Sequence, residues 1–293
     1  LPVLSEVAMA DGMTADALVT LARSTLCCVY YEQVTLELLS HDNPSPTIET
    51  HQLATPCKSG DIDWFISHSW HDDPRAKFQC LQEEANAFKR LRGRWPVLWL
   101  DKVCIDQANI RQSLKCLPVY LMACNSMLVL GGTTYIDRLW CVWELYTLFA
   151  VSERDPKLIV RDFSGGATTL TERLATFTLG EHANCYDPNE KAKLLQAIRA
   201  APGGETSFNK VIRSLADTVG KQSADYSSKS SMLLAIRKSV SVRVSRSQSA
   251  ERDGNGSSGS NGPRSSNTSR TSKEKDSPRH SLSARGNLTG GAT

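Results

Sequence analysis

Residues 62–101 read IDWFISHSWHDDPRAKFQCLQEEANAFKRLRGRWPVLWLD, and this stretch decides the fold class. Its two ends, 62–69 and 96–101, are short apolar runs of the kind that form buried strands. The segment between them, 74–93, predicts an amphipathic helix that ends at a glycine. Its apolar residues recur at helical spacing: Phe78, Leu81, Ala85, Phe88 and Leu91. The order strand, helix, strand indicates two parallel strands joined by a crossover helix.

The same alternation continues along the chain. Apolar runs predict strands at 126–132 and 157–163, and a weak fifth strand at 182–187. Helical patterns separate or follow these strands, at 110–124, 137–152, 168–179, 188–201 and 206–220. We therefore expect an α/β protein with a doubly wound, parallel sheet of about five strands, covered by helices on both faces.

Composition divides the chain into three predicted parts. Residues 1–60 predict a helical lead-in and a polar, proline-bearing linker, and residues 61–220 predict the α/β domain. Residues 221–293 are rich in Ser, Gly, Asn and Arg, so we expect a disordered tail. Arg residues shortly before Ser in this tail suggest sites for basic-directed kinases, although a solvated linker of this composition produces such matches by chance.

Charge is unevenly distributed between these parts. Residues 1–220 hold 21 Lys and Arg against 26 Asp and Glu, a net of −5, whereas residues 221–293 hold 13 against 5, a net of +8. The acidic domain lacks the basic footprint of nucleic-acid binding, so we predict no nucleic-acid partner.

The cysteines and the absence of long apolar runs bear on the compartment. Cys104, Cys116, Cys124 and Cys141 lie inside apolar stretches, and nothing resembles a secretory signal. We expect reduced, buried thiols in a cytoplasmic protein. No run approaches the roughly 18–20 apolar residues that cross a bilayer, so no membrane segment is expected in this piece. Because the sequence begins at Leu1 and not at methionine, we expect a piece of a longer protein or a processed form.

In open parallel sheets, ligands bind where the carboxyl ends of the strands meet. That rule nominates the residues after the first strand, Ser67, His68, Ser69 and Trp70, and Asp101 after the second. Glu144 lies in RLWCVWELY (138–146) on the following helix. A carboxylate among such apolar neighbours lies either at the rim of the core or in a functional cleft.

Three segments resemble, in order and spacing, the TIR domain of the Toll/interleukin-receptor/resistance-protein family. They are DWFISHSWHDD (63–73), VLWLDKVCIDQANI (97–110) and SMLVLGGTTYIDRLWCVWEL (126–145), whose Trp-Cys-x-x-Glu-Leu matches the family's helix signature. The resemblance covers about residues 61–200 and implies a flavodoxin-like fold. It departs from the family at Ser67, which is not followed by an aromatic residue and an Arg, so Arg75, Lys102 or Arg138 would have to contact a phosphate.

The resemblance implies one of two activities. In the first, the protein is an NAD⁺ nucleosidase in which Glu144 stabilises the ribosyl cation, with NAD⁺ as substrate and no cofactor. The substrate-binding residues would then be Ser67, His68, Ser69, Trp70, Asp101 and Trp140. In the second, it is a non-enzymatic signalling scaffold that assembles with other TIR domains, homotypically or heterotypically, through the loop at 102–112. A flavodoxin-like enzyme that transfers nucleosides is a third possibility.

One further pattern invites a metal interpretation. His68, His71, Asp72 and Asp73 form H-x-x-H-D-D, but no second ligand cluster with zinc spacing is close in sequence. We therefore predict no metal site and interpret these residues as a loop at a strand end, with His68 available to line a cleft.

Overall fold

The structure is a computed structural model in which the chain divides into two units, Leu1–Ile236 and Arg237–Thr293. All described residues belong to the first unit. Apart from Lys221, the tail predicted to be disordered lies outside them. The described residues are 13–40, 48–106, 113, 115–151, 157–165, 168–185 and 188–221.

The described residues form a mixed sheet of six strands in the order β2-β1-β4-β3-β5-β6. Four of them run parallel, as predicted: β3 (Ile62–His68), β4 (Val97–Trp99), β5 (Cys124–Gly131) and β6 (Leu158–Asp162). The expectation of a purely parallel sheet is wrong, because β1 (Cys27–Tyr30) pairs antiparallel with β4, and β2 (Thr55–Pro56) pairs antiparallel with β1.

The antiparallel edge comes from the segment predicted as a lead-in. Cys27, Cys28 and Val29 are buried because β1 lies between β2 and β4. At the other edge of the sheet, the weak strand predicted at 182–187 is not formed by the described residues there. Asn184 makes only an isolated bridge with Arg138, and β6 is the edge strand.

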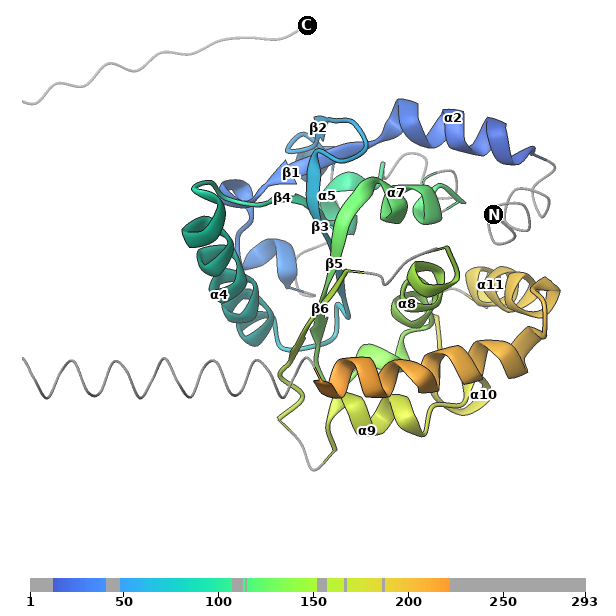
Figure 1. The fold of residues 1–293 in the computed structure, drawn as a ribbon. Helices are drawn as coiled ribbons and strands as arrows, with labels where there is room; N and C mark the ends of the chain where they lie inside the picture. Colours follow the sequence, from blue (N-terminus) through green and yellow to red (C-terminus); the bar gives the residue numbers. More distant parts are fainter. Residues whose placement is uncertain are drawn as a thin grey trace, which may run out of the picture. The chain divides into compact units, whose positions relative to one another are not determined.

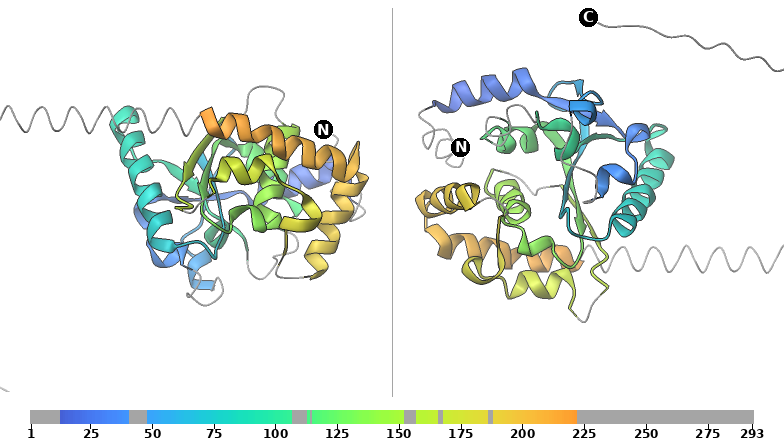
Figure 2. Two further views of the ribbon diagram at one scale, coloured as in Figure 1. Left: turned by 90° about the horizontal axis from the view of Figure 1, so that it is seen from below. Right: turned by 180° about the vertical axis from the view of Figure 1, so that it is seen from behind.

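Helices cover both faces of the sheet. Helix α4 packs against β5 on one face, and α8 packs against β3 on the other (Figures 1 and 2). Helix α4 begins at an Asp73 cap, whose carboxylate accepts hydrogen bonds from two backbone amides, and stops at Gly93 with φ of 75°. The helices are α2 (Ala15–Thr25), α3 (Ile48–His51), α4 (Pro74–Arg92), α5 (Asp101–Cys104), α7 (Leu117–Ala123), α8 (Leu139–Val151), α9 (Leu170–Ala175), α10 (Leu179–His182), α11 (Pro188–Ala200) and a helix at 204–221.

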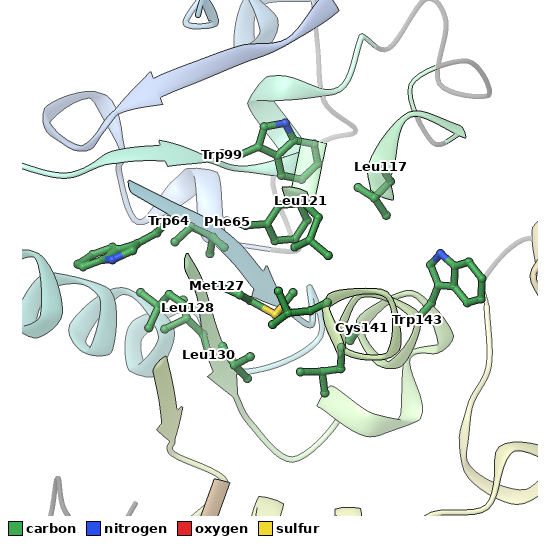
Figure 3. Close-up of a cluster of buried hydrophobic side chains, with 14 of the residues drawn as sticks. Trp64, Phe65, Trp99, Leu117, Leu121, Met127, Leu128, Leu130, Cys141 and Trp143 are labelled. Atoms are coloured by element: carbon green, nitrogen blue, oxygen red, sulfur yellow. The ribbon is translucent and has the colours of Figure 1, made fainter. Parts of the chain in front are cut away.

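Adjacent residues of β3 fill the core on opposite faces of the sheet. Phe65 stacks on its register partner Trp99 with ring centroids 4.5 Å apart, on the face toward α7 and α8 (Figure 3). Trp64 points to the other face, where it meets Phe88 of α4 edge-on at 5.2 Å. Because both faces are covered, the whole of β3 is buried. Its polar side chains, Asp63, Ser67 and His68, lie toward its two ends.

We find no helix in the described part of the chain with the length and apolar character that a membrane span requires.

Candidate active site

Glu144 reaches the carboxyl end of β3. Ser67 is the second-last residue of that strand, and its hydroxyl donates a hydrogen bond of 2.6 Å to Glu144 Oε2. Tyr135, in the 3-10 turn Tyr135–Asp137 that precedes α8, lies 2.6 Å from the same Ser67 oxygen. Since the Ser67 hydroxyl donates its hydrogen bond to Glu144, the Tyr135 hydroxyl must donate to Ser67. The three side chains therefore form one chain of hydrogen bonds.

Burial makes the charged form of Glu144 unfavourable. It raises the pKa of this carboxyl to about 8; the Ser67 hydrogen bond opposes the rise, and the nearby negative charge of Asp101 adds to it. The Glu144 side chain is nevertheless half-buried, so it keeps some contact with solvent. No Lys or Arg of the described residues forms an ion pair with it. A cationic group that enters this site would therefore be bound by an otherwise uncompensated carboxylate.

Asp101 and Trp70, which follow β4 and β3 in the chain, are hydrogen-bonded to each other. The Trp70 indole N–H donates to Asp101 Oδ2 at 2.6 Å, and the Lys102 backbone amide donates to Oδ1 at 2.7 Å. The Lys102 ammonium lies 5.1 Å from the centre of the Trp70 ring and donates to the Ser40 carbonyl. Trp70 is therefore held at its polar edge by Asp101, and the Lys102 ammonium lies over one face of its ring.

A buried lysine, Lys77, binds the backbone of the loop that follows β3. Lys77 of α4 donates to the Ser69 carbonyl at 2.8 Å and, more weakly, to the Trp70 carbonyl. Burial lowers the pKa of Lys77 to about 8, while the charges of Asp72 and Asp101 act in the opposite direction. Its contacts make Lys77 a positioning residue for Trp70.

Asp72 joins this loop to the end of β5. Its carboxylate accepts hydrogen bonds from the backbone amides of Gly132 and Thr134 and from the Thr134 hydroxyl. A Cβ at Gly132 would lie 2.3 Å from the Asp72 side chain, so this close approach requires glycine. Asp72 therefore binds backbone, and the described residues contain no group of three or more His, Cys, Asp or Glu side chains suited to a metal ion.

His68 belongs to this group of residues, but its side chain is almost completely buried. Burial lowers the pKa of His68 to about 4, with the charge of Lys77 acting in the same direction and that of Asp101 opposing both. The ring is therefore neutral at physiological pH. The His68 carbonyl accepts a hydrogen bond from the Cys141 thiol, which fixes the end of β3 to α8.

Two of the predicted site residues have other partners. The Ser69 hydroxyl is fully buried and lies 2.7 Å from the Thr134 hydroxyl. The Trp140 indole N–H donates to Glu190 of α11 at 3.1 Å, so its polar edge is directed to α11 rather than toward Ser67. The structure thus gathers Ser67, His68, Trp70, Asp101 and Glu144, and directs Ser69 and Trp140 to other contacts.

Sequence reasoning did not single out Tyr135 or Lys77. Tyr135 lies three residues after Gly132, in the turn that follows β5, a position where a ligand-facing side chain is common. Lys77 stands four residues before Leu81, on the apolar stripe of α4, where a charged residue is unusual. The sequence position of each residue could therefore have identified it as a candidate for the site.

A cavity of about 450 Å³ lies elsewhere, around the end of α2 and the Tyr120 side of α7. None of the predicted site residues lines it. Residues 107–112, which make up most of the predicted assembly loop at 102–112, lie outside the described residues. The cavity is lined by Ser24, Thr25, Leu26, Cys27, His51, Ala54, Pro56, Cys104, Asp106, Ser113 and Tyr120.

Comparison with known proteins finds no family model that matches the chain and no curated protein that matches it significantly.

Proposed function

We propose that this chain carries a TIR-like domain of flavodoxin-like type that cleaves NAD⁺ between nicotinamide and ribose. The observation that supports it most is the carboxylate of Glu144, which contacts Ser67 at the carboxyl edge of the sheet and lacks a cationic partner among the described residues. Open parallel sheets place their ligand sites at this edge. The resemblance of residues 61–200 to TIR domains supports the same assignment.

The chemistry needs only one carboxylate. When the bond breaks, its electron pair leaves with nicotinamide, which becomes neutral, and positive charge develops on the ribose ring. Glu144 then stabilises that charge, and water adds to the ribosyl carbon and loses a proton. Because the substrate carries a cationic pyridinium, its binding favours the ionised form of Glu144, whose pKa in the free protein is about 8.

Other residues of the site take supporting roles. Tyr135 and Ser67 orient the Glu144 carboxylate, and Trp70, held by Asp101, forms an aromatic wall. Arg75 is exposed and Arg138 half-buried, and neither forms an ion pair within the described ranges. We assign them as the contacts available to the pyrophosphate.

The compartment and partners follow from the same proposal. All nine cysteines fall in the described residues and are free thiols, which suits a reducing, cytoplasmic setting. Other TIR domains, from a second copy or a different chain, are the proposed partners.

The test is nicotinamide release from NAD⁺ by the full chain at high protein concentration, with self-association followed by light scattering. We expect release by the parent protein and none by Glu144→Ala. Glu190→Ala, which removes a carboxylate of α11, is the matched control and should retain release. No release under any condition that assembles the protein would contradict the enzymatic proposal.

One observation favours the scaffold instead. At neutral pH a carboxyl with a pKa of about 8 is mostly protonated, and a neutral acid bonded to Ser67 is compatible with a purely structural role. The scaffold predicts that charge reversal at Asp106, in the proposed assembly loop, disrupts self-association while NAD⁺ is never consumed. Unchanged association in Asp106→Lys would contradict that loop assignment.

A further inference from the structure

The end of α4 that lies farthest from the candidate site carries a dense group of cations. Residues 89–94, KRLRGR, are all exposed and contain four Lys or Arg residues. We call this segment the basic rim. Helix α4 has 19 residues and extends about 28 Å from Asp73, beside the site, to Gly93 (Figure 1). The basic rim and the candidate site are therefore at opposite ends of the parallel strands.

The basic rim also exposes apolar surface. Three large apolar side chains are exposed in the described part of the chain: Tyr30, Leu91 and Met122. Leu91, at 80% exposure, lies inside the rim. Tyr30 is the register partner of Val97, three residues after Arg94. Two of the three thus lie at this end of the sheet, together with the four cations of the rim.

Of the four cations of the rim, only Arg94 forms an ion pair with a described residue. Arg94 binds Asp63 but is 55% exposed, and the Lys89 ammonium lies 4.0 Å from the centre of the Trp95 ring. Arg90 and Arg92 form no ion pair with any described residue. A helix C-terminus favours cations through its dipole, which explains their position. The dipole does not explain an exposed leucine between them.

The aromatic rings near the rim indicate which anionic partner fits. Trp95 is covered by Tyr31, whose ring centroid is 4.8 Å away, and by Lys89. Phe88 lies between Trp64 and the Arg94 guanidinium. Because these rings already have neighbours, they offer no platform for nucleic-acid bases. An exposed aliphatic side chain flanked by arginines suits the interface of an anionic bilayer, where cations meet phosphates and a leucine enters the headgroup region.

We propose that the basic rim docks the protein on an anionic phospholipid surface. Arg90 and Arg92 contact lipid phosphates and Leu91 enters the headgroup layer. Since the rim is at the amino ends of the parallel strands, docking leaves the carboxyl edge with Glu144 facing away from the bilayer. This proposal is independent of NAD⁺ turnover.

The test is flotation of the full chain with vesicles of phosphatidylcholine, with and without phosphatidylserine. The tail, with a net charge of +8, is present in every variant, so variants are compared within the full chain. We expect a fall of about fivefold in binding to the anionic vesicles for each arginine removed by Arg90→Ala or Arg92→Ala. Leu91→Ser, which leaves the charge unchanged, should also weaken binding by about fivefold.

Matched controls use exposed residues elsewhere. Lys193→Ala with Lys210→Ala removes two exposed cations, and Met122→Ser removes an exposed apolar side chain; each should bind as the parent protein does. Unchanged binding of Leu91→Ser, or an equal loss in the control pair, would overturn the proposal. So would rim variants that lose affinity for a single-stranded oligonucleotide but not for vesicles. Unfolding curves that match the parent confirm that the variants are folded.

Discussion

Asp63 and Glu144 are carboxylates that lie at opposite ends of β3, and their surroundings differ. Asp63, at the amino end, is 7% exposed and accepts two hydrogen bonds from the Arg94 guanidinium, at 2.6 and 2.9 Å. The Val97 backbone amide adds a third, at 2.9 Å. Glu144, at the carboxyl end, accepts one hydrogen bond from Ser67.

This difference separates a structural carboxylate from a candidate functional one. The charge of Asp63 is compensated within the fold, whereas the charge of Glu144 is opposed by burial and by Asp101. An uncompensated carboxylate costs stability, and such groups are concentrated at functional sites.

The largest effect concerns activity. Glu144→Gln should lower nicotinamide release at least about 100-fold, because the neutral amide cannot stabilise the ribosyl cation. Asp63→Asn, an equivalent change at the other end of the strand, should leave release within a few-fold of the parent protein. The measurement is the initial rate at matched concentrations of folded protein. Equal losses in the two variants would show that the ends of the strand do not differ in function.

Stability, unlike activity, should depend strongly on Asp63. Asp63→Ala leaves the Val97 amide and the Arg94 guanidinium without their acceptor, and should lower the free energy of unfolding by about 1–3 kcal/mol. Urea denaturation followed by circular dichroism measures it. Glu205→Ala, which breaks the exposed pair of Glu205 with Arg199, is the control and should cost less than about 1 kcal/mol. A smaller loss for Asp63→Ala than for this control would refute the structural role of Asp63.

The pH dependence of stability should reveal the burial of Glu144. Its pKa is raised from 4.5 to about 8, so between these values the folded protein holds a proton that the unfolded chain lacks. The contribution of Glu144 to stability therefore falls as pH rises through this window, by up to ~1.4 kcal/mol per pH unit. Glu144→Gln should remove this fall, so the free energy of unfolding of the variant should increase relative to that of the parent protein as pH rises. A constant difference between the two proteins from pH 5 to pH 8 would contradict the raised pKa.

The smallest effects are shifts in the pH profile of activity. The value of kcat/KM should rise with pH through an apparent pKa of about 8, as Glu144 ionises. Asp101→Asn removes a neighbouring negative charge and should move this midpoint to lower pH. Ser67→Ala removes the hydrogen bond that favours the ionised form and should move it to higher pH. Shifts in the same direction would disprove the assigned causes.

Periodicity predicted the regular part of this fold well. The four parallel strands and the helices α4 and α8 appear within two residues of their predicted ends, because a buried strand and an amphipathic helix have distinct apolar patterns. The antiparallel edge could not be predicted in this way. The pattern of CCVYY around β1 is ambiguous, and β2 has only two residues, so its pairing depends on tertiary contacts.

The candidate site was predictable where a rule of topology applied. Ser67 lies at the end of β3 and Asp101 follows β4, and Glu144 was nominated by the resemblance to TIR domains. The partners of Trp140 and Ser69 were not predictable, because they depend on how α11 and the loop after β5 pack. Lys77 shows the same limit, since only the fold reveals that its ammonium binds the loop of Trp70.

The most direct test of the central claim is the titration of Glu144 itself. The full chain with isotope-labelled glutamate, followed by NMR, gives the midpoint of the carboxyl signal that disappears in Glu144→Gln. We predict a midpoint of about 8 that falls in Asp101→Asn. A midpoint near 4.5, unchanged in Asp101→Asn, would show that the carboxylate is solvated or already paired with a cation, and the distinction between the two ends of β3 would be lost.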